Sequence, residues 1–152
     1  MKPAFPSSLA FWHLSWGYRD AGDATFCLVR SDSYAASGGG FAYLPCVFLY
    51  FRCVELALKA ILVHNSVPAH EITQKVGHRI SPLLARAESF AALSTFGISA
   101  QDRRLLDRYS ADYSEKWFEY PDDVSPEYPP LDDLKAIANQ VCDAARTYLD
   151  KV

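Results

Sequence analysis

One acidic residue occupies a position where burial would force it to find a partner. If residues 44–64 are helical, a 3.6-residue period gathers the apolar side chains on one stripe, and Glu55 lies in the middle of it. A buried ionised carboxylate must take up a proton or recruit hydrogen-bond donors, because its desolvation is costly. The other members of the stripe are Leu44, Val47, Phe48, Phe51, Val54, Leu58, Ile61 and Leu62.

The candidate donors for Glu55 are two basic residues of the same segment, Arg52 and Lys59, and the imidazole of His78. Two interpretations stay open. Glu55 and Lys59 can form a simple i,i+4 pair that contributes about 0.2–0.5 kcal/mol. Alternatively, Glu55 anchors a polar cluster with Lys59 or His78 that fixes the packing of helices or forms part of a site, since perturbed titratable groups concentrate at functional sites.

His78 is the best single candidate for acid–base chemistry. A lone histidine at the start of a helical region often only caps or packs that region, and this interpretation stays open. RNA cleavage without a metal ion would instead use the imidazole as proton acceptor, beside an arginine that stabilises the phosphorane charge. The candidate catalytic residues are therefore His78, Arg104 and Arg108, with Arg79 next to the histidine.

Basic residues and tyrosines over residues 79–120 could contact a nucleic acid. The arginines could receive phosphate, but the acids beside them favour a solvated, partly neutralised surface. The tyrosines could stack a base, although aromatic residues at helical spacing more often belong to a core. The arginines are Arg79, Arg86, Arg103, Arg104 and Arg108, the acids are Asp102, Asp107 and Asp112, and the tyrosines are Tyr109, Tyr113 and Tyr120.

No metal or cofactor site is predicted. The four cysteines and four histidines show no zinc-ligand spacing. The glycines at positions 38–40 lack the Lys-Ser/Thr that completes a phosphate-binding loop, and neither a G-x-S-x-G nor an H-E-x-x-H motif is present.

The elements that position these residues all have helical periodicity. We expect helices over residues 8–34, 42–64, 81–96, 99–120 and 131–151, separated by a loop at 37–40, a turn region at 65–77 and a proline-rich loop at 121–130. Gly17 and Gly22 weaken the first helix and can divide it in two. Ser81, before Pro82, and Ser99 are predicted helix caps. The prediction is an all-α, single-domain bundle of four to five helices over residues 1–152.

The composition limits which partners and which compartment this domain can have. Fifteen basic and eighteen acidic residues give a net charge of −3, so a nucleic acid would have to be bound by a local patch. The apolar run at 41–63 is interrupted by Arg52, Glu55 and Lys59, which predicts a buried helix and no membrane association. The scattered cysteines, Cys27, Cys46, Cys53 and Cys142, predict reduced core thiols in a cytoplasmic protein.

Two segments, VELALKAIL at residues 54–62 and GHRISPLL at 77–84, carry a resemblance to the HEPN domain family. The resemblance implies a helical bundle of the kind met in toxin–antitoxin and antiviral defence systems and beside nucleotidyltransferases. Many HEPN proteins are thought to be metal-independent ribonucleases with an arginine followed, after four to six residues, by a histidine, and with two such sites meeting across a dimer.

The sequence departs from that signature. After Arg104 the corresponding positions hold Tyr109, Ser110 and Ala111, and after Arg108 they hold Tyr113, Ser114 and Glu115. The resemblance therefore implies the non-catalytic branch of the family, in which the domain binds a nucleotide, an RNA or a partner protein.

Three functions follow as hypotheses. The first is a non-catalytic, homodimeric HEPN-type module that binds a nucleotide or RNA, or a protein partner such as a nucleotidyltransferase or an antitoxin. The second is a divergent metal-independent ribonuclease that uses His78 with nearby arginines. The third is a small-ligand sensor with a pocket near Glu55, Lys59 and His78. The predicted binding or polar-cluster residues are Glu55, Lys59, His78, Arg79, Tyr109 and Tyr113.

Overall fold

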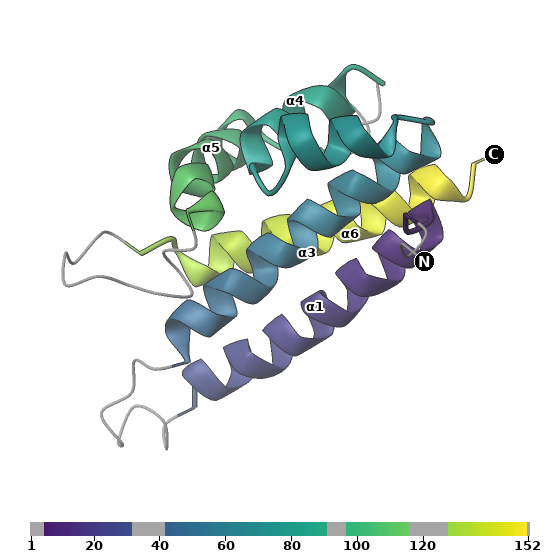
Figure 1. The fold of residues 1–152 in the computed structure, drawn as a ribbon. Helices are drawn as coiled ribbons and strands as arrows, with labels where there is room; N and C mark the ends of the chain where they lie inside the picture. Colours follow the sequence, from purple (N-terminus) through teal and green to yellow (C-terminus); the bar gives the residue numbers. More distant parts are fainter. Residues whose placement is uncertain (1–4, 32–41, 91–96, 116–127, 152) are drawn as a thin grey trace.

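Helices make up all the regular secondary structure in the residues that the computed structural model describes, which are 5–31, 42–90, 97–115 and 128–151. This confirms the predicted all-α bundle (Figure 1). No helix within these ranges is both long and apolar enough to cross a membrane. The elements are α1 (Ser8–Val29), α3 (Tyr43–His64), the π-helical turn η1 (Glu71–Val76), α4 (Ile80–Glu88), α5 (Ala100–Ser114) and α6 (Leu131–Leu149).

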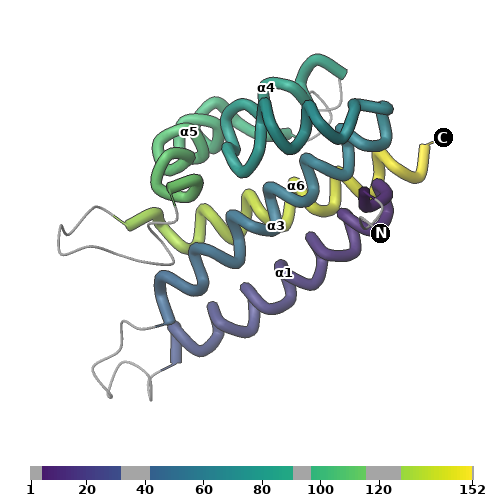
Figure 2. Tube along the Cα trace, viewed as in Figure 1, coloured from purple at the N-terminus to yellow at the C-terminus, as the bar shows by residue number. Residues whose placement is uncertain are grey.

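Three long helices form one side of the bundle, and α4 and α5 cover the other side of α3 (Figures 1 and 2). Helix α1 runs antiparallel to α3, because Ser15 Oγ donates to the carbonyl of Cys53 and Cys46 Sγ donates to that of Gly22. The central helix α3 contacts α1, α4 and α6.

Helix α6 runs parallel to α3. The Tyr43 hydroxyl, at the start of α3, donates to the carbonyl of Pro129, and the Tyr148 hydroxyl bonds Asn65 Oδ1 at the other end. Because α1 is antiparallel to both, the start of α1 and the end of α6 lie at the same end of the bundle (Figure 1).

The central helix is apolar on both sides, as predicted, and it is buried within one chain. Every residue from Cys53 to Leu62 is buried, so α1, α4 and α6 cover both its stripe and much of its back. The sequence also allowed a subunit contact on this helix, but its apolar residues do not require one.

Helix α1 is one continuous helix, so of the two alternatives that the sequence left open, its glycines do not divide it. Gly22 is a packing residue. A Cβ there would lie 2.8 Å from Cε1 of Tyr50, and the missing side chain lets the tyrosine ring pack against the backbone of α1. Gly17 faces open space, with no atom within 4 Å of such a Cβ.

The start of α4 differs from the prediction. Ser81 is not the cap: Arg79 is the N-cap, and the backbone N–H of Ser81 donates to Oγ of Ser110 on α5 at 3.2 Å. Ile80 is fully buried and begins the helix two residues before Pro82. The partner that satisfies this helix start is therefore distant in sequence, which a local capping pattern does not reveal.

The segments around α4 also differ. The predicted turn region at 65–77 contains the helical turn η1, whose C-cap, Gly77, has φ +56°, a conformation that favours glycine. Helix α4 ends at Glu88, although the prediction continued it to residue 96: residues 89–90 form a turn, and residues 91–96 lie outside the described residues. The predicted loops at 37–40 and most of 121–130, with Tyr120, also lie outside them.

The predicted cap of α5 is confirmed. The Ser99 hydroxyl accepts from the backbone N–H of Asp102, and the Asp102 carboxylate accepts from the backbone N–H of Ser99, which completes a capping box. Three of the cysteines are core thiols as expected, but Cys27 is exposed, because it faces outward near the end of α1.

Candidate functional site

The carboxylate of Glu55 lies at the meeting point of three elements. Glu55 is fully buried on α3, and its helix neighbours are the buried Lys59 and the half-buried Arg52. His78 reaches it from the turn before α4, and Tyr113 reaches it from α5. We call these five residues the Glu55 cluster.

Every member of the cluster contacts the carboxylate directly. Lys59 Nζ donates to Oε1 at 2.7 Å, and Arg52 Nη1 lies 2.9 Å from Oε1 and 2.8 Å from Oε2. His78 Nδ1 lies 3.0 Å from Oε1, and the Tyr113 hydroxyl donates to Oε2. Of the two interpretations of Glu55, the structure therefore supports the polar cluster, in which the Lys59 pair is one contact among four.

These partners keep the carboxylate ionised. Burial has the largest single effect on the pKa of Glu55 and raises it, but the Lys59 charge, hydrogen bonds from Lys59 and Tyr113, and the Arg52 charge together lower it below its ordinary value. Burial, followed by the Glu55 charge, raises the pKa of Tyr113. The cluster therefore holds a carboxylate and a neutral phenol at neutral pH.

His78 is the most accessible member of the cluster, with 59% of its side chain exposed. Its Nδ1 lies 3.0 Å from Glu55 Oε1 and 3.1 Å from Arg52 Nη1. One nitrogen can donate to the carboxylate or accept from the guanidinium, but not both, so its protonation decides which neighbour it binds. Arg52 was predicted only as a donor to Glu55; its position beside His78 has no sequence signal, since 26 positions separate the two residues.

Arg79, which was predicted as a binding or polar-cluster residue, does not join the Glu55 cluster. It is exposed, and its guanidinium donates to the backbone carbonyl of Lys75. Two other arginines of the predicted phosphate region are in ion pairs: Arg86 with Glu71 at 3.1 Å, and Arg103 with Glu88 and Asp107. These pairs favour the solvated-surface interpretation for that part of the region.

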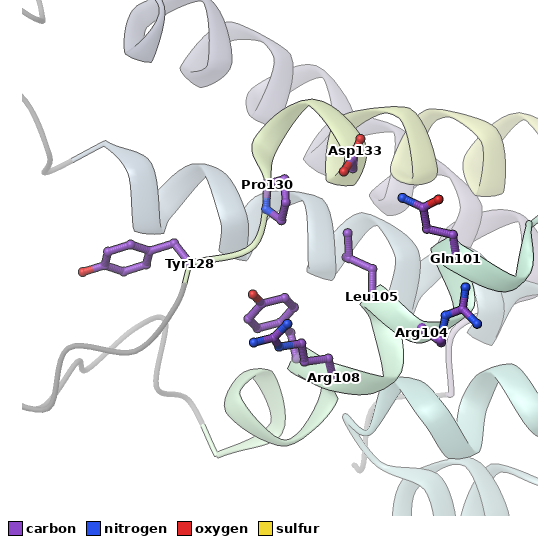
Figure 3. Close-up of a pocket in the computed structure, with 8 residues that line it drawn as sticks. Gln101, Arg104, Leu105, Arg108, Tyr128, Pro130 and Asp133 are labelled. Atoms are coloured by element: carbon purple, nitrogen blue, oxygen red, sulfur yellow. The ribbon is translucent and has the colours of Figure 1, made fainter.

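The remaining predicted residues gather in a second place, a hollow of about 750 Å³ between α5 and the start of α6 (Figure 3). Arg104 and Arg108 stand one turn apart on α5, and the Arg108 guanidinium lies over the Tyr109 ring, 5.6 Å from its centre. The lining residues are Gln101, Arg104, Leu105, Arg108, Tyr109, Tyr128, Pro130 and Asp133.

The two described tyrosines of the predicted series belong to the core. Tyr109 and Tyr113 are each 5% exposed, and the Tyr113 ring stacks on Phe51 with ring centres 5.4 Å apart. Tyr109 also lines the hollow. Tyr128, 47% exposed, and Asp133 were missed by the sequence interpretation, because Tyr128 lies within the proline-rich segment, Asp133 follows it, and no helical spacing connects them to α5.

The two groups have different chemistry. The Glu55 cluster combines an exposed imidazole with a guanidinium and a buried carboxylate, and the α5 hollow combines guanidinium groups with tyrosines. Within the described residues, no group of three histidine, cysteine or acidic side chains is arranged to hold a metal ion.

Comparison with known proteins identifies no relative of this chain. No protein-family model matches the sequence, no curated protein matches it, and no solved structure matches it. The HEPN resemblance therefore rests on the residues in VELALKAIL and GHRISPLL.

Proposed function

We propose that this chain is a non-catalytic, HEPN-type helical domain that binds a nucleotide or a short stretch of RNA in the α5 hollow. The observation that carries the proposal is that Arg104, Arg108 and Tyr109 line one hollow of about 750 Å³. That volume is within the range of small-ligand sites, about 300–1,000 Å³.

The phosphate would bind at the α5 wall. Arg104 has no hydrogen-bond or ion-pair partner within the described part of the chain, so its guanidinium does not have to give up a protein contact to bind a phosphate. Arg108 lies one turn away on the same face. Charge-assisted hydrogen bonds from arginine to phosphate are among the stronger polar contacts in proteins.

The base would bind at the other end of the hollow. The Tyr128 ring is exposed and lies next to the ring of Tyr43, with centres 5.4 Å apart. Stacking of a base on an aromatic side chain contributes about 1–3 kcal/mol and depends little on sequence. Asp133, on α6, adds an acceptor for a ribose hydroxyl or a base amino group and disfavours a phosphate at its side (Figure 3).

The lining of this hollow supports binding without cleavage. No histidine is among its described lining residues, so the hollow lacks the imidazole that would act beside the arginines as general base near neutral pH. His78 belongs to the Glu55 cluster, where its nearest arginine is Arg52.

Equilibrium binding of a fluorescent single-stranded RNA, measured by anisotropy at several salt concentrations, tests the proposal. Arg104→Ala should weaken binding about tenfold and reduce the salt dependence by about one phosphate contact, a slope change of about 0.7. Arg103→Ala is the matched control, since it removes the same charge from the same helix but outside the hollow. Equal losses in both variants, or no binding at low salt, would contradict the proposal.

A second candidate, the divergent ribonuclease, is favoured by the 3.1 Å contact between Arg52 Nη1 and His78 Nδ1. In that reaction His78 would take the proton of a ribose 2′-hydroxyl, the 2′-oxygen would attack the phosphorus, and the P–O5′ bond would break as the 5′-oxygen takes a proton from water, which leaves a 2′,3′-cyclic phosphate. Arg52 would stabilise the charge on the phosphorane oxygens.

Incubation of the protein with structured RNA in the presence of a chelator tests this second candidate. Cleavage should disappear in His78→Ala and persist in His70→Ala, a change at an exposed histidine outside the cluster. If wild-type protein does not cleave, or if both variants cleave equally, the second candidate fails and the binding proposal is unaffected.

A further inference from the structure

Two buried cysteine thiols meet a buried serine where α1, α3 and α6 pack together. Ser15 Oγ, on α1, lies 3.4 Å from Cys53 Sγ on α3 and 3.6 Å from Cys142 Sγ on α6. Ser15 and Cys53 are fully buried, and Cys142 is 1% exposed. None of the three belongs to the Glu55 cluster or lines the α5 hollow. The core therefore contains a pair of nucleophilic side chains that the proposed function does not use.

The two sulfur atoms are also neighbours of each other. A hydrogen bond between the thiols has the largest effect on the pKa of both cysteines. Cys53 Sγ also lies 3.7 Å from the carbonyl oxygen of Ala138, one helical turn before Cys142. Because a helical side chain lies over the turn that precedes it, this contact places Cys53 against the turn that the Cys142 side chain covers. The two thiols are therefore adjacent across the contact between α3 and α6, as a disulfide requires.

Cys142 differs from an ordinary core thiol. The hydrogen bond from Cys53 lowers its pKa, burial opposes this effect, and Ser15 and Arg19 lower the pKa further. Cys46 is as buried as Cys142, but there burial has the largest effect and raises the pKa to about 11. The thiolate is the form of cysteine that attacks a peroxide. Cys142 is therefore the nucleophile of the pair, and Cys46 is a buried thiol for comparison.

The thiol of Cys142 lies close to the protein surface. Asp143, the next residue of α6, has 72% of its side chain exposed, and its carboxylate lies 2.7 Å from the Arg19 guanidinium. Arg19 therefore reaches from this surface carboxylate to the neighbourhood of Cys142, whose pKa its charge lowers. Hydrogen peroxide is close to water in size, so a small local opening of the structure admits it, whereas a thiol-labelling reagent is much larger.

From this geometry we propose that Cys53 and Cys142 form a dithiol site that hydrogen peroxide oxidises to a disulfide between α3 and α6. The Cys142 thiolate attacks one peroxide oxygen: an S–O bond forms, the O–O bond breaks, and the leaving hydroxide takes up the proton that the thiol released. The Cys53 sulfur then attacks the Cys142 sulfur: the S–S bond forms, the S–O bond breaks, and hydroxide leaves as water with the Cys53 proton. The two sulfurs lose two electrons to the peroxide, which becomes two water molecules.

Treatment of the folded chain with hydrogen peroxide, followed by peptide mass mapping, tests the site. In a Cys27→Ser background, which removes the exposed thiol, one intramolecular disulfide should form between Cys53 and Cys142, and a dithiol reductant should reverse it. Cys142→Ser should abolish this disulfide, and Cys46→Ser, the matched change at another buried thiol, should leave it intact. The mass map itself requires no change in the core, so the test does not depend on how well the core variants fold.

The same reaction in urea separates the folded site from ordinary thiol chemistry. An unfolded chain closes short loops most readily, so Cys46 and Cys53 should form its main disulfide. Thermal unfolding of the oxidised folded chain should have a midpoint about 10 °C above that of the reduced chain, because the new bond closes a loop of about 90 residues. A folded chain that forms no disulfide, that pairs Cys46 instead, or whose midpoint does not rise on oxidation overturns the proposal.

Discussion

The phenol of Tyr113 on α5 donates a hydrogen bond to the carboxylate of Glu55 on α3. The same ring stacks on Phe51, with ring centres 5.4 Å apart and planes inclined by 19°. Helix α5 otherwise packs mainly against α4, so this residue connects it to the central helix through one polar and one apolar contact. The Glu55 cluster thus joins the two sides of the bundle.

Removal of the Glu55 charge should destabilise the fold strongly. Glu55→Gln leaves the buried Lys59 ammonium and the half-buried Arg52 guanidinium without their counter-charge. Breaking a buried ion pair by removing one partner costs about 3–5 kcal/mol. Urea unfolding should show a loss of this size. Asp150→Asn, which breaks the exposed pair with Arg146, is the control and should change the free energy of unfolding by under about 0.5 kcal/mol.

The cluster should also make stability depend on pH in the acidic range. The folded-state pKa of Glu55 is below its ordinary value of 4.5, so its contribution is fully present above about pH 4.5 and is lost as the pH falls through the folded-state pKa. The difference in the free energy of unfolding between wild type and Glu55→Gln should therefore shrink below pH 4.5. A difference that stays constant down to pH 2 would mean that the folded chain does not depress this pKa.

Loss of the Tyr113 hydroxyl should weaken the link between α5 and α3 without removing the ring stack. Tyr113→Phe keeps the contact with Phe51 but deletes the hydrogen bond to a charged acceptor. Hydrogen bonds to charged groups contribute about 1.5–3 kcal/mol. Denaturant unfolding should show a loss in that range, and hydrogen exchange should accelerate in α5 more than in α6. Tyr109→Phe is the comparison, and a loss as large there would contradict a specific role for the Tyr113 hydroxyl.

Alanine substitution at the two glycines of α1 should change the free energy of unfolding in opposite directions. Gly22→Ala places a Cβ 2.8 Å from the Tyr50 ring, and overpacking of this kind typically costs about 1–3 kcal/mol. Gly17→Ala meets nothing and should stabilise the monomer by up to about 1 kcal/mol through helix propensity. Thermal unfolding at low protein concentration measures both. Equal effects at the two positions would show that Tyr50 moves aside at little cost.

The thiols should differ sharply in reactivity. Cys27 is exposed and should react at once with a thiol reagent, whereas Cys46, Cys53 and Cys142 should react only on unfolding. Cys142 is the informative case: a hydrogen bond from the Cys53 thiol, followed by those of Ser15 and the charge of Arg19, lowers its pKa to about 7 despite burial. Fast labelling that persists in Cys27→Ser would mean that Cys142 becomes accessible in the folded chain.

The sequence by itself determined the features that depend on neighbouring positions. Apolar periodicity is a property of one helix, and it predicted the central helix and α6 to within two residues. The Ser99 cap depends on residues three positions apart, and it was predicted for the same reason. The position of Glu55 on an apolar stripe is also visible within one helix. Because burying a carboxylate is costly, the sequence alone predicted that Glu55 needs hydrogen-bond donors.

Only the tertiary structure decided which distant groups meet. Tyr113 and His78 reach Glu55 because α4 and α5 pack over α3, while Arg79, next to His78 in sequence, points to the carbonyl of Lys75. The role of Gly22 was also decided by the tertiary structure, because it depends on the Tyr50 ring of another helix. These contacts depend on how helices pack against one another, and side chains far apart in the chain leave no periodic signal of their meeting.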